Sequence, residues 1–140
     1  MSALTLTFVD DNEADHVLIQ DAAESLGYPV RIQHFVRSDQ FLTSLDRGEV
    51  TQDALITDLN MPGATGFDLI RALRERPGQG HLPVLVFSTS PTRADRDQAA
   101  ELNVAGYFVK PISFDGLIEQ LHDMVAVIRR CTSSHEHRAP

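Results

Sequence analysis

The chain has 140 residues, enough for one domain with a substantial core, and its 42% hydrophobic and 23% charged residues are ordinary for a globular protein. Its formal net charge of −8 argues against binding to nucleic acid or to an anionic membrane, because their phosphate groups would be repelled. The single cysteine excludes a disulfide bond within the chain and fits a reducing compartment. No apolar run is long enough to span a membrane and no signal-peptide pattern is present, so we expect a cytoplasmic protein.

Strand-like and helix-like segments alternate five times along the chain. Apolar and β-branched runs predict strands over 4–9, 30–36, 54–57, 83–87 and 106–109. A helical pattern follows each run, and the helices are expected to begin near Asn12, Ser38, Gly66, Ser90 and Ser113. The strands starting at 4, 54 and 83 are nearly continuous apolar runs, which is typical of strands buried on both faces. The alternation predicts an α/β fold, a doubly wound (βα)5 sandwich around a five-stranded parallel sheet.

The helix ends and the domain limits can also be predicted. Ser90 is expected to cap the fourth helix, with Pro91 at its first position. The helix after the first strand has a cap signal at Asn12, although Asp11 could serve as the cap instead. No repeat or linker divides the chain, so residues 1–130 are expected to form one domain. Residues 131–140 are polar and are expected to form a disordered tail.

Acidic residues directly follow two of the predicted strands. Asp10 and Asp11 come after the first strand, and Asp58 comes after the third. The carboxyl ends of parallel strands meet at one edge of a sheet, where such folds bind ligands. Two carboxylates about 4 Å apart repel by about 1 kcal/mol in water, and more in a protein. A hard cation with oxygen ligands is the natural compensation. Ser88 and Lys110 follow the fourth and fifth strands and fit the same site.

This set of residues resembles the receiver domain of two-component response regulators, over residues 4 to about 128. The family signature is an acidic pair after the first strand, an acceptor Asp after the third, Ser or Thr after the fourth and Lys-Pro after the fifth. All of these occur here in order, and the segment from Asn60 to Gly63, followed by Gly66, looks like the family's loop after the acceptor. The resemblance implies that residues 1–130 are a receiver domain.

The resemblance implies a phosphorylation site that uses Mg²⁺. Asp58 would be the phosphoacceptor, attacking a phosphohistidine of a sensor histidine kinase to form an acyl phosphate. Asp11 and Asp58 would bind Mg²⁺ directly, Asp10 would act largely through water, and Asn60 would offer its backbone carbonyl group. The chain would catalyse only its own phosphorylation and dephosphorylation, so it is not expected to be an enzyme that turns over a metabolite.

The resemblance also implies a conformational switch around the phosphoryl group. Lys110 would pair with the phosphoryl oxygens, and a cis peptide bond before Pro111 would aim it inward. Ser88 would donate a hydrogen bond to the phosphoryl group, and Tyr107 looks like the switch aromatic of the family. Thr89 departs from the family pattern, since many members carry alanine or glycine there, and its methyl and hydroxyl groups would narrow access to the acyl phosphate.

The resemblance extends to partners. A chain without an output domain is similar to the single-domain, chemotaxis-regulator-like members, which act on a separate downstream protein. The opening segment from Asp10 to Asp15 looks more like the small regulators paired with bacterial phytochrome histidine kinases, which implies a role in light signalling. Core packing or a homodimer face, formed with the helix around 93–102, could each explain the many apolar positions of the last helix.

Two other functions fit parts of the sequence. A phosphorylation-independent binding module could use the same fold, but the acceptor, the acidic pair and the lysine are all intact here. A metal-dependent phosphohydrolase with an aspartyl nucleophile would need an Asp general acid two residues after Asp58, where Asn60 stands and cannot transfer a proton. His16 and His34 show no metal-ligand spacing, and the sequence assigns them no role.

Overall fold

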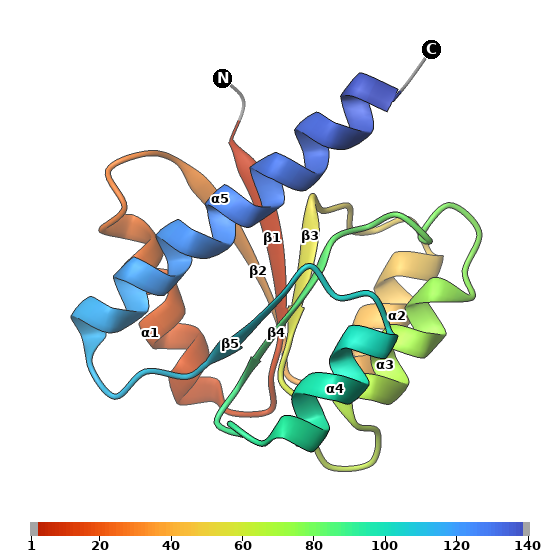
Figure 1. Cartoon of the computed structure of the whole chain (residues 1–140), viewed down its shortest axis with the longest axis horizontal. Helices are drawn as coiled ribbons and strands as arrows, with labels where there is room; N and C mark the ends of the chain where they lie inside the picture. Colours follow the sequence, from red (N-terminus) through yellow and green to blue (C-terminus); the bar gives the residue numbers. More distant parts are fainter. Residues whose placement is uncertain (1–2, 139–140) are drawn as a thin grey trace.

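The computed structural model describes residues 3–138, with side chains described through Thr132. A five-stranded parallel sheet has the strand order β2-β1-β3-β4-β5, and a helix follows each strand (Figure 1). This confirms the predicted doubly wound (βα)5 fold. The elements are β1 (Leu4–Val9), α1 (Glu13–Glu24), β2 (Val30–Phe35), α2 (Ser38–Asp46), β3 (Ala54–Thr57), α3 (Gly66–Arg74), β4 (Val84–Ser88), α4 (Arg93–Glu101), β5 (Gly106–Val109) and α5 (Phe114–Arg138). No helix within residues 3–138 is long and apolar enough to cross a membrane.

Helices cover both faces of the sheet. Figure 1 shows α1 and α5 on one face and α2, α3 and α4 on the other. Two hydrophobic cores result, because successive side chains of a strand point to opposite faces. The core under α1 and α5 includes Leu6, Phe8, Ile56 and Leu121, all at most 2% exposed. The core under α2, α3 and α4 includes Phe41, Leu55, Ile70 and Val86, all fully buried.

The register of the central strands brings the predicted site residues together. Val9 at the end of β1 pairs with Thr57 at the end of β3, so the next residues, Asp10 and Asp58, emerge side by side. The main-chain N–H of Asp58 donates to the carbonyl oxygen of Val9 at 3.0 Å. At the ends of the neighbouring strands β4 and β5, the N–H of Lys110 donates to the carbonyl oxygen of Ser88 at 2.9 Å. All these residues therefore lie at the carboxyl edge, as the sequence predicts.

Helix α4 begins two residues later than expected. Its cap is Thr92, whose hydroxyl oxygen accepts a hydrogen bond from the N–H of Asp95 at 3.3 Å, so the prediction of Ser90 as the cap was wrong. Ser90 is engaged differently, because its hydroxyl group donates to the Asp95 carboxylate at 2.6 Å. Pro91 accordingly lies in the β4–α4 loop and not in the first turn of the helix.

Helix α5 extends further than expected. Residues 131–138 continue the helix to Arg138, so the prediction of a disordered tail from Cys131 is corrected for these residues, while 139–140 lie outside the described part of the chain. The segment is polar, but it contains no glycine or proline after Gly116 that would interrupt the helix before Arg138. The hydroxyl group of Thr132 donates to the Ile128 carbonyl oxygen at 3.0 Å, one turn earlier, and so joins the helical hydrogen bonding.

Candidate metal and phosphoryl site

Three carboxylates meet at the carboxyl edge of the sheet. Asp10, Asp11 and Asp58 each offer an oxygen atom, and these atoms all lie within 4.8 Å of one another. Asp10 and Asp58 are buried, whereas Asp11 is exposed. Asp11 is not the cap of α1, because the Asn12 side chain accepts the N–H groups of Ala14 and Asp15. The carboxylate of Asp11 therefore has no capping role.

Asp58 is held firmly by the backbone around it. Its Oδ1 accepts the N–H of Leu59 at 2.7 Å, and its Oδ2 lies 3.3 Å from Nζ of Lys110. The first residue of α3 packs directly behind it, since a Cβ atom on Gly66 would overlap the carbonyl oxygen of Asp58. Asn60 is exposed, and its N–H lies 3.5 Å from Oδ1 of Asp58. One oxygen of Asp58 is thus fixed by the backbone, while the other faces the lysine.

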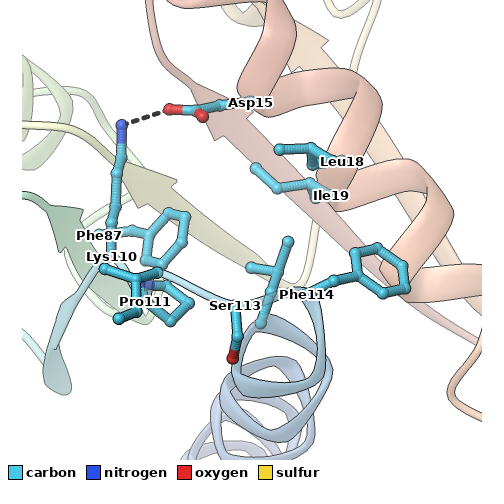
Figure 2. A pocket seen from close by; sticks show the side chains of 10 residues that line it. Asp15, Leu18, Ile19, Phe87, Lys110, Pro111, Ser113 and Phe114 are labelled. Atoms are coloured by element: carbon cyan, nitrogen blue, oxygen red, sulfur yellow. Dashed lines mark hydrogen bonds and ion pairs between the residues drawn. The ribbon is translucent and has the colours of Figure 1, made fainter.

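Lys110 is the positive charge of the site. Its Nζ lies 2.7 Å from Oδ2 of Asp10, 2.7 Å from Oδ2 of Asp15 and 3.3 Å from Oδ2 of Asp58, and its side chain is 13% exposed. Figure 2 shows Lys110 reaching across to Asp15 on α1. Burial alone lowers the pKa of Lys110, but hydrogen bonds to Asp10 and Asp15 and the nearby negative charges raise it more. The net pKa is raised, so the ammonium group stays charged.

Asp15 is a member of this site that was not predicted from the sequence. In the sequence Asp15 is only the end of the acidic segment that starts at Asp10, whereas the structure places its carboxylate on Lys110. Asp15 lies in the first turn of α1, which starts at the same edge of the sheet as the acidic pair. The sequence did contain a signal for this role of Asp15: it is an acidic residue in the first turn of a helix that directly follows a strand of the site. Its direction toward the lysine depended on the packing of α1 against the sheet.

The donor set suits a hard divalent cation. Burial raises the pKa of Asp10, and the hydrogen bonds from Lys110 and Asn12 offset this only in part. The site gathers four carboxylates, those of Asp10, Asp11, Asp15 and Asp58, and the ammonium group of Lys110, which leaves an excess of negative charge when all are ionised. All the side-chain donors are oxygen atoms, which Mg²⁺ and Mn²⁺ prefer. The residues present therefore fit such an ion.

The residues predicted to switch lie on the β4 side of the site. Ser88 is buried, and its Oγ accepts the N–H of Ser90 at 3.2 Å, while Thr89 is exposed. Tyr107 is half-buried, and its hydroxyl group donates to the carbonyl oxygen of Ser90 at 2.7 Å. The guanidinium group of Arg96 lies 4.7 Å from the centre of the Tyr107 ring. The hydroxyl group of Tyr107 is therefore tied to the loop that follows Ser88.

The prediction of a cis peptide bond at Pro111 was wrong. Between residues 3 and 138 every peptide bond is trans. A cis bond is not needed to aim the lysine, because the pairing of β5 with β4 fixes the backbone of Lys110, and from there its side chain reaches Asp10 and Asp15. The trans form is also the ordinary state of a bond before proline, favoured by about 0.5–1 kcal/mol.

The fold and the site together define a class of protein: a doubly wound α/β domain with an acidic, lysine-containing site at the carboxyl edge of its sheet. The chain belongs to the response regulator receiver domain family, whose model matches residues 6–122. This confirms the resemblance of the sequence to receiver domains of two-component systems.

Proteins with known roles are similar to this chain along most of its length. It is 34% identical over 119 residues to the chemotaxis protein CheY of Pseudomonas aeruginosa, covering 84% of this chain and 93% of the relative. It is 31% identical over 121 residues to the chemotaxis protein CheY-3 of Vibrio cholerae, covering 84% of this chain and 88% of the relative. The similarity therefore spans nearly the whole of these relatives.

Solved structures support the fold at lower sequence identity. The phosphorylated cyanobacterial phytochrome response regulator RcpA superposes with a TM-score of 0.79 at 23% identity, covering 88% of this chain and 91% of that one. The response regulator RPA3017, from red light signalling of R. palustris, superposes with a TM-score of 0.77 at 22% identity, covering 86% of this chain and 90% of that one. The Mn²⁺-bound form of the response regulator Rcp1 superposes with a TM-score of 0.76 at 20% identity, covering 86% of this chain and 91% of that one. At these identities, the structures show a shared fold.

Proposed function

We propose that this protein is a phosphoacceptor switch, which receives a phosphoryl group on Asp58 from a histidine kinase and signals the change to a separate protein. The observation that carries the proposal is the position of Asp58: one oxygen is fixed by the N–H of Leu59, and the other lies 3.3 Å from the ammonium group of Lys110. A carboxylate held in this way is oriented for nucleophilic attack and has a cation beside it for the phosphoryl oxygens.

The transfer is a substitution at phosphorus. A carboxylate oxygen of Asp58 attacks the phosphorus of the phosphohistidine, and the bond from phosphorus to the imidazole nitrogen breaks with its electron pair left on the nitrogen. The product is an acyl phosphate. Lys110, charged because its pKa is raised, pairs with the phosphoryl oxygens, and its contacts with Asp10 and Asp15 hold it at the site.

We infer that Mg²⁺ binds beside Asp58. Asp10, Asp11 and Asp58 would hold it, with the backbone carbonyl group of Asn60, and the excess of negative charge in this cluster supports the assignment. Such an ion, when bound, neutralises charge on the phosphoryl oxygens. The Mn²⁺-bound form of a structural neighbour is consistent with a divalent ion in this fold. The protein would promote only its own phosphorylation and dephosphorylation and would turn over no metabolite.

The conformational readout would run through the β4–α4 loop. A phosphoryl group adds about −1.5 to −2 units of charge. A hydrogen bond from Ser88 to that group would draw the loop with it, and Tyr107 is tied to the loop through the Ser90 carbonyl oxygen. Displacing the loop therefore breaks or moves the Tyr107 contact, which changes the surface formed by α4 and β5. A homodimer formed through α4 and α5 stays a prediction.

We infer that the kinase docks beside α1 and the β5–α5 loop. The large hydrophobic side chains that are exposed in the described part of the chain are Val17, Leu18, Ile112 and Phe114. They come from α1, the β5–α5 loop and the first residue of α5, and a cavity of about 290 Å³ lies there, lined by Leu18, Phe114 and Lys110 among others (Figure 2). An apolar surface next to the acceptor site is suited to a helical segment of the kinase that carries the donor histidine.

A direct test of the acceptor uses Mg²⁺ with acetyl phosphate, or with beryllofluoride as a phosphoryl mimic. Wild-type protein is expected to take up one phosphoryl group and to show amide shifts around Ser88 and Tyr107, whereas Asp58→Asn takes up none. Intact mass and amide NMR report the two results. A folded, Mg²⁺-bound wild type without label or shifts would sink the switch and favour the phosphorylation-independent binding module.

The docking surface is tested by Leu18→Ser together with Ile112→Ser, both exposed positions. Phosphotransfer from a kinase is expected to fall at least about tenfold, because the apolar contact is lost, while labelling by acetyl phosphate in the same variant stays the same. Equal losses with both donors would contradict a docking role. Comparing a phytochrome histidine kinase with other kinases of the same cell also tests the proposed link to light signalling, which requires faster transfer from the phytochrome.

A further inference from the structure

Two histidines form a hydrogen-bonded pair directly behind the acidic residues. His16 lies on α1 and is buried, and its Nε2 is 2.7 Å from the main-chain oxygen of Asp10. Its Nδ1 is 2.7 Å from Nδ1 of His34 on β2. The two rings meet edge to face, with centroids 4.6 Å apart and planes at 71°. The pair thus links a helix and an edge strand to the loop that carries the acidic pair.

The direction of each hydrogen bond follows from chemistry. A carbonyl oxygen can only accept, so Nε2 of His16 carries the hydrogen atom. A neutral ring has one N–H, so in the form in which both rings are neutral, Nδ1 of His16 accepts and Nδ1 of His34 donates. Burial and the neighbouring His16 lower the pKa of His34 to about 4, so His34 is neutral at pH 7. The result is a continuous chain of donors from His34 through His16 to the Asp10 carbonyl group.

The carbonyl group that His16 contacts belongs to the peptide bond between Asp10 and Asp11. The other polar atoms of Asp10 are also engaged: its N–H donates to Phe35 at 3.0 Å, Oδ1 accepts from Asn12 at 2.9 Å, and Oδ2 accepts from Lys110 at 2.7 Å. Asp11 is exposed, so the position of its carboxylate depends largely on the orientation of this peptide plane. A hydrogen bond to that plane therefore acts on both acidic residues.

We propose that His16, itself held by His34, is a positioning residue for the divalent cation, because its hydrogen bond fixes the peptide bond that joins Asp10 to Asp11. This inference rests on the proposed cation site and deepens it. His16 does not touch the ion or the phosphoryl group; it reduces the reorganisation that the two carboxylates undergo when an ion binds. His34 supports it from β2 by fixing the orientation of the His16 ring.

The test measures Mn²⁺ binding to the full chain by electron paramagnetic resonance. His16→Phe keeps a ring of similar size but has no donor, and it is expected to weaken binding about fivefold or more. His16→Gln keeps an N–H donor and is expected to restore the affinity to within about twofold of wild type. His34→Phe is expected to have an intermediate effect. His122→Phe, which removes an exposed histidine on α5, is the matched control and leaves the affinity unchanged.

A second readout does not depend on a metal ion. Long-range proton–nitrogen NMR of the wild type is expected to show the hydrogen atom on Nε2 of His16 and on Nδ1 of His34. The opposite tautomers, or a folded His16→Phe variant that binds Mn²⁺ as tightly as wild type, would overturn the positioning role alone. If His16→Phe does not fold, the positioning role is decided by Mn²⁺ binding to His16→Gln and His34→Phe and by the tautomers of the wild type. A wild type that binds neither Mn²⁺ nor Mg²⁺ would overturn the cation site as well.

Discussion

Lys110 places one ammonium group among three carboxylates that come from separate segments of the chain. Asp10 follows β1, Asp15 lies in α1, and Asp58 follows β3. A largely buried ammonium group is costly without partners, so removing one carboxylate shifts the contacts of Lys110 to the remaining ones. The balance among these contacts decides how far the lysine competes with a cation for Asp10 and Asp58. Asp15, which is not among the proposed cation ligands, is therefore the residue that keeps the lysine partly away from them.

This gives a prediction for Asp15→Asn. The lysine would turn to Asp10 and Asp58 alone, and one negative charge would leave the site, so Mg²⁺ affinity is expected to fall about 3–10-fold, or about 1 kcal/mol. Isothermal titration of the folded variant with Mg²⁺ measures the change. Asp21→Asn removes the same charge from an exposed position further along α1 and serves as the control. Equal affinities for Asp15→Asn and wild type would refute this role of Asp15.

At the scale of elements, the site depends on how helices start at the carboxyl edge. Helix α3 begins at Gly66, with Thr65 and Asp68 forming a reciprocal capping box, and its first residue packs on the main chain of Asp58. The N–H of Gly66 also donates to the carbonyl oxygen of Leu59 at 3.0 Å. The absence of a side chain at Gly66 lets the helix approach so closely. The acceptor and the helix behind it are thus one packed unit.

Gly66→Ala is therefore expected to destabilise the protein by about 1–3 kcal/mol, because the new methyl group would overlap the backbone of Asp58 and push it away. Urea unfolding measures the stability, and acetyl phosphate labelling of the folded fraction should also fall. Gly80→Ala is the matched control, since its added methyl group would meet no atom within 4 Å. Similar stabilities for the two alanine variants would contradict the close packing.

For the molecule as a whole, the half-buried His34 makes stability depend on pH. The pKa of His34 is about 4 in the folded protein, through burial and the neighbouring His16, against about 6.5 when unfolded. Between these values the unfolded chain binds a proton that the folded chain does not. Stability from this group is therefore complete above about pH 6.5 and is lost as the pH falls toward 4.

The expected loss is about 1–2 kcal/mol, less than the full pKa difference implies, because solvent reaches part of the His34 ring. Urea unfolding at pH 7 and pH 4.5 measures it, with His34→Gln as the comparison. The variant lacks this titration, and the carboxylates that titrate in the same range are common to both proteins. An identical loss of stability in the two proteins would show that His34 does not contribute.

The fold and most of the site could be predicted from the sequence, because both depend on local signals. Apolar periodicity marks the strands and helices, and residues after parallel strands must share one edge, so Asp10, Asp58 and Lys110 could be brought together without coordinates. The wrong prediction of where α4 starts shows the limit of such signals. Ser90 and Thr92 are both good caps, and only the contact of Ser90 with Asp95 decides between them.

The sequence by itself determined the class of fold, the edge at which the acidic residues gather and the family to which the chain belongs, since these follow from periodicity and order along the chain. Only the tertiary structure decided the partners of Lys110, the meeting of His16 with His34 and the contact of Tyr107 with Ser90. These contacts join residues from different elements, and their geometry depends on how each helix packs against the sheet. No local pattern specifies that packing.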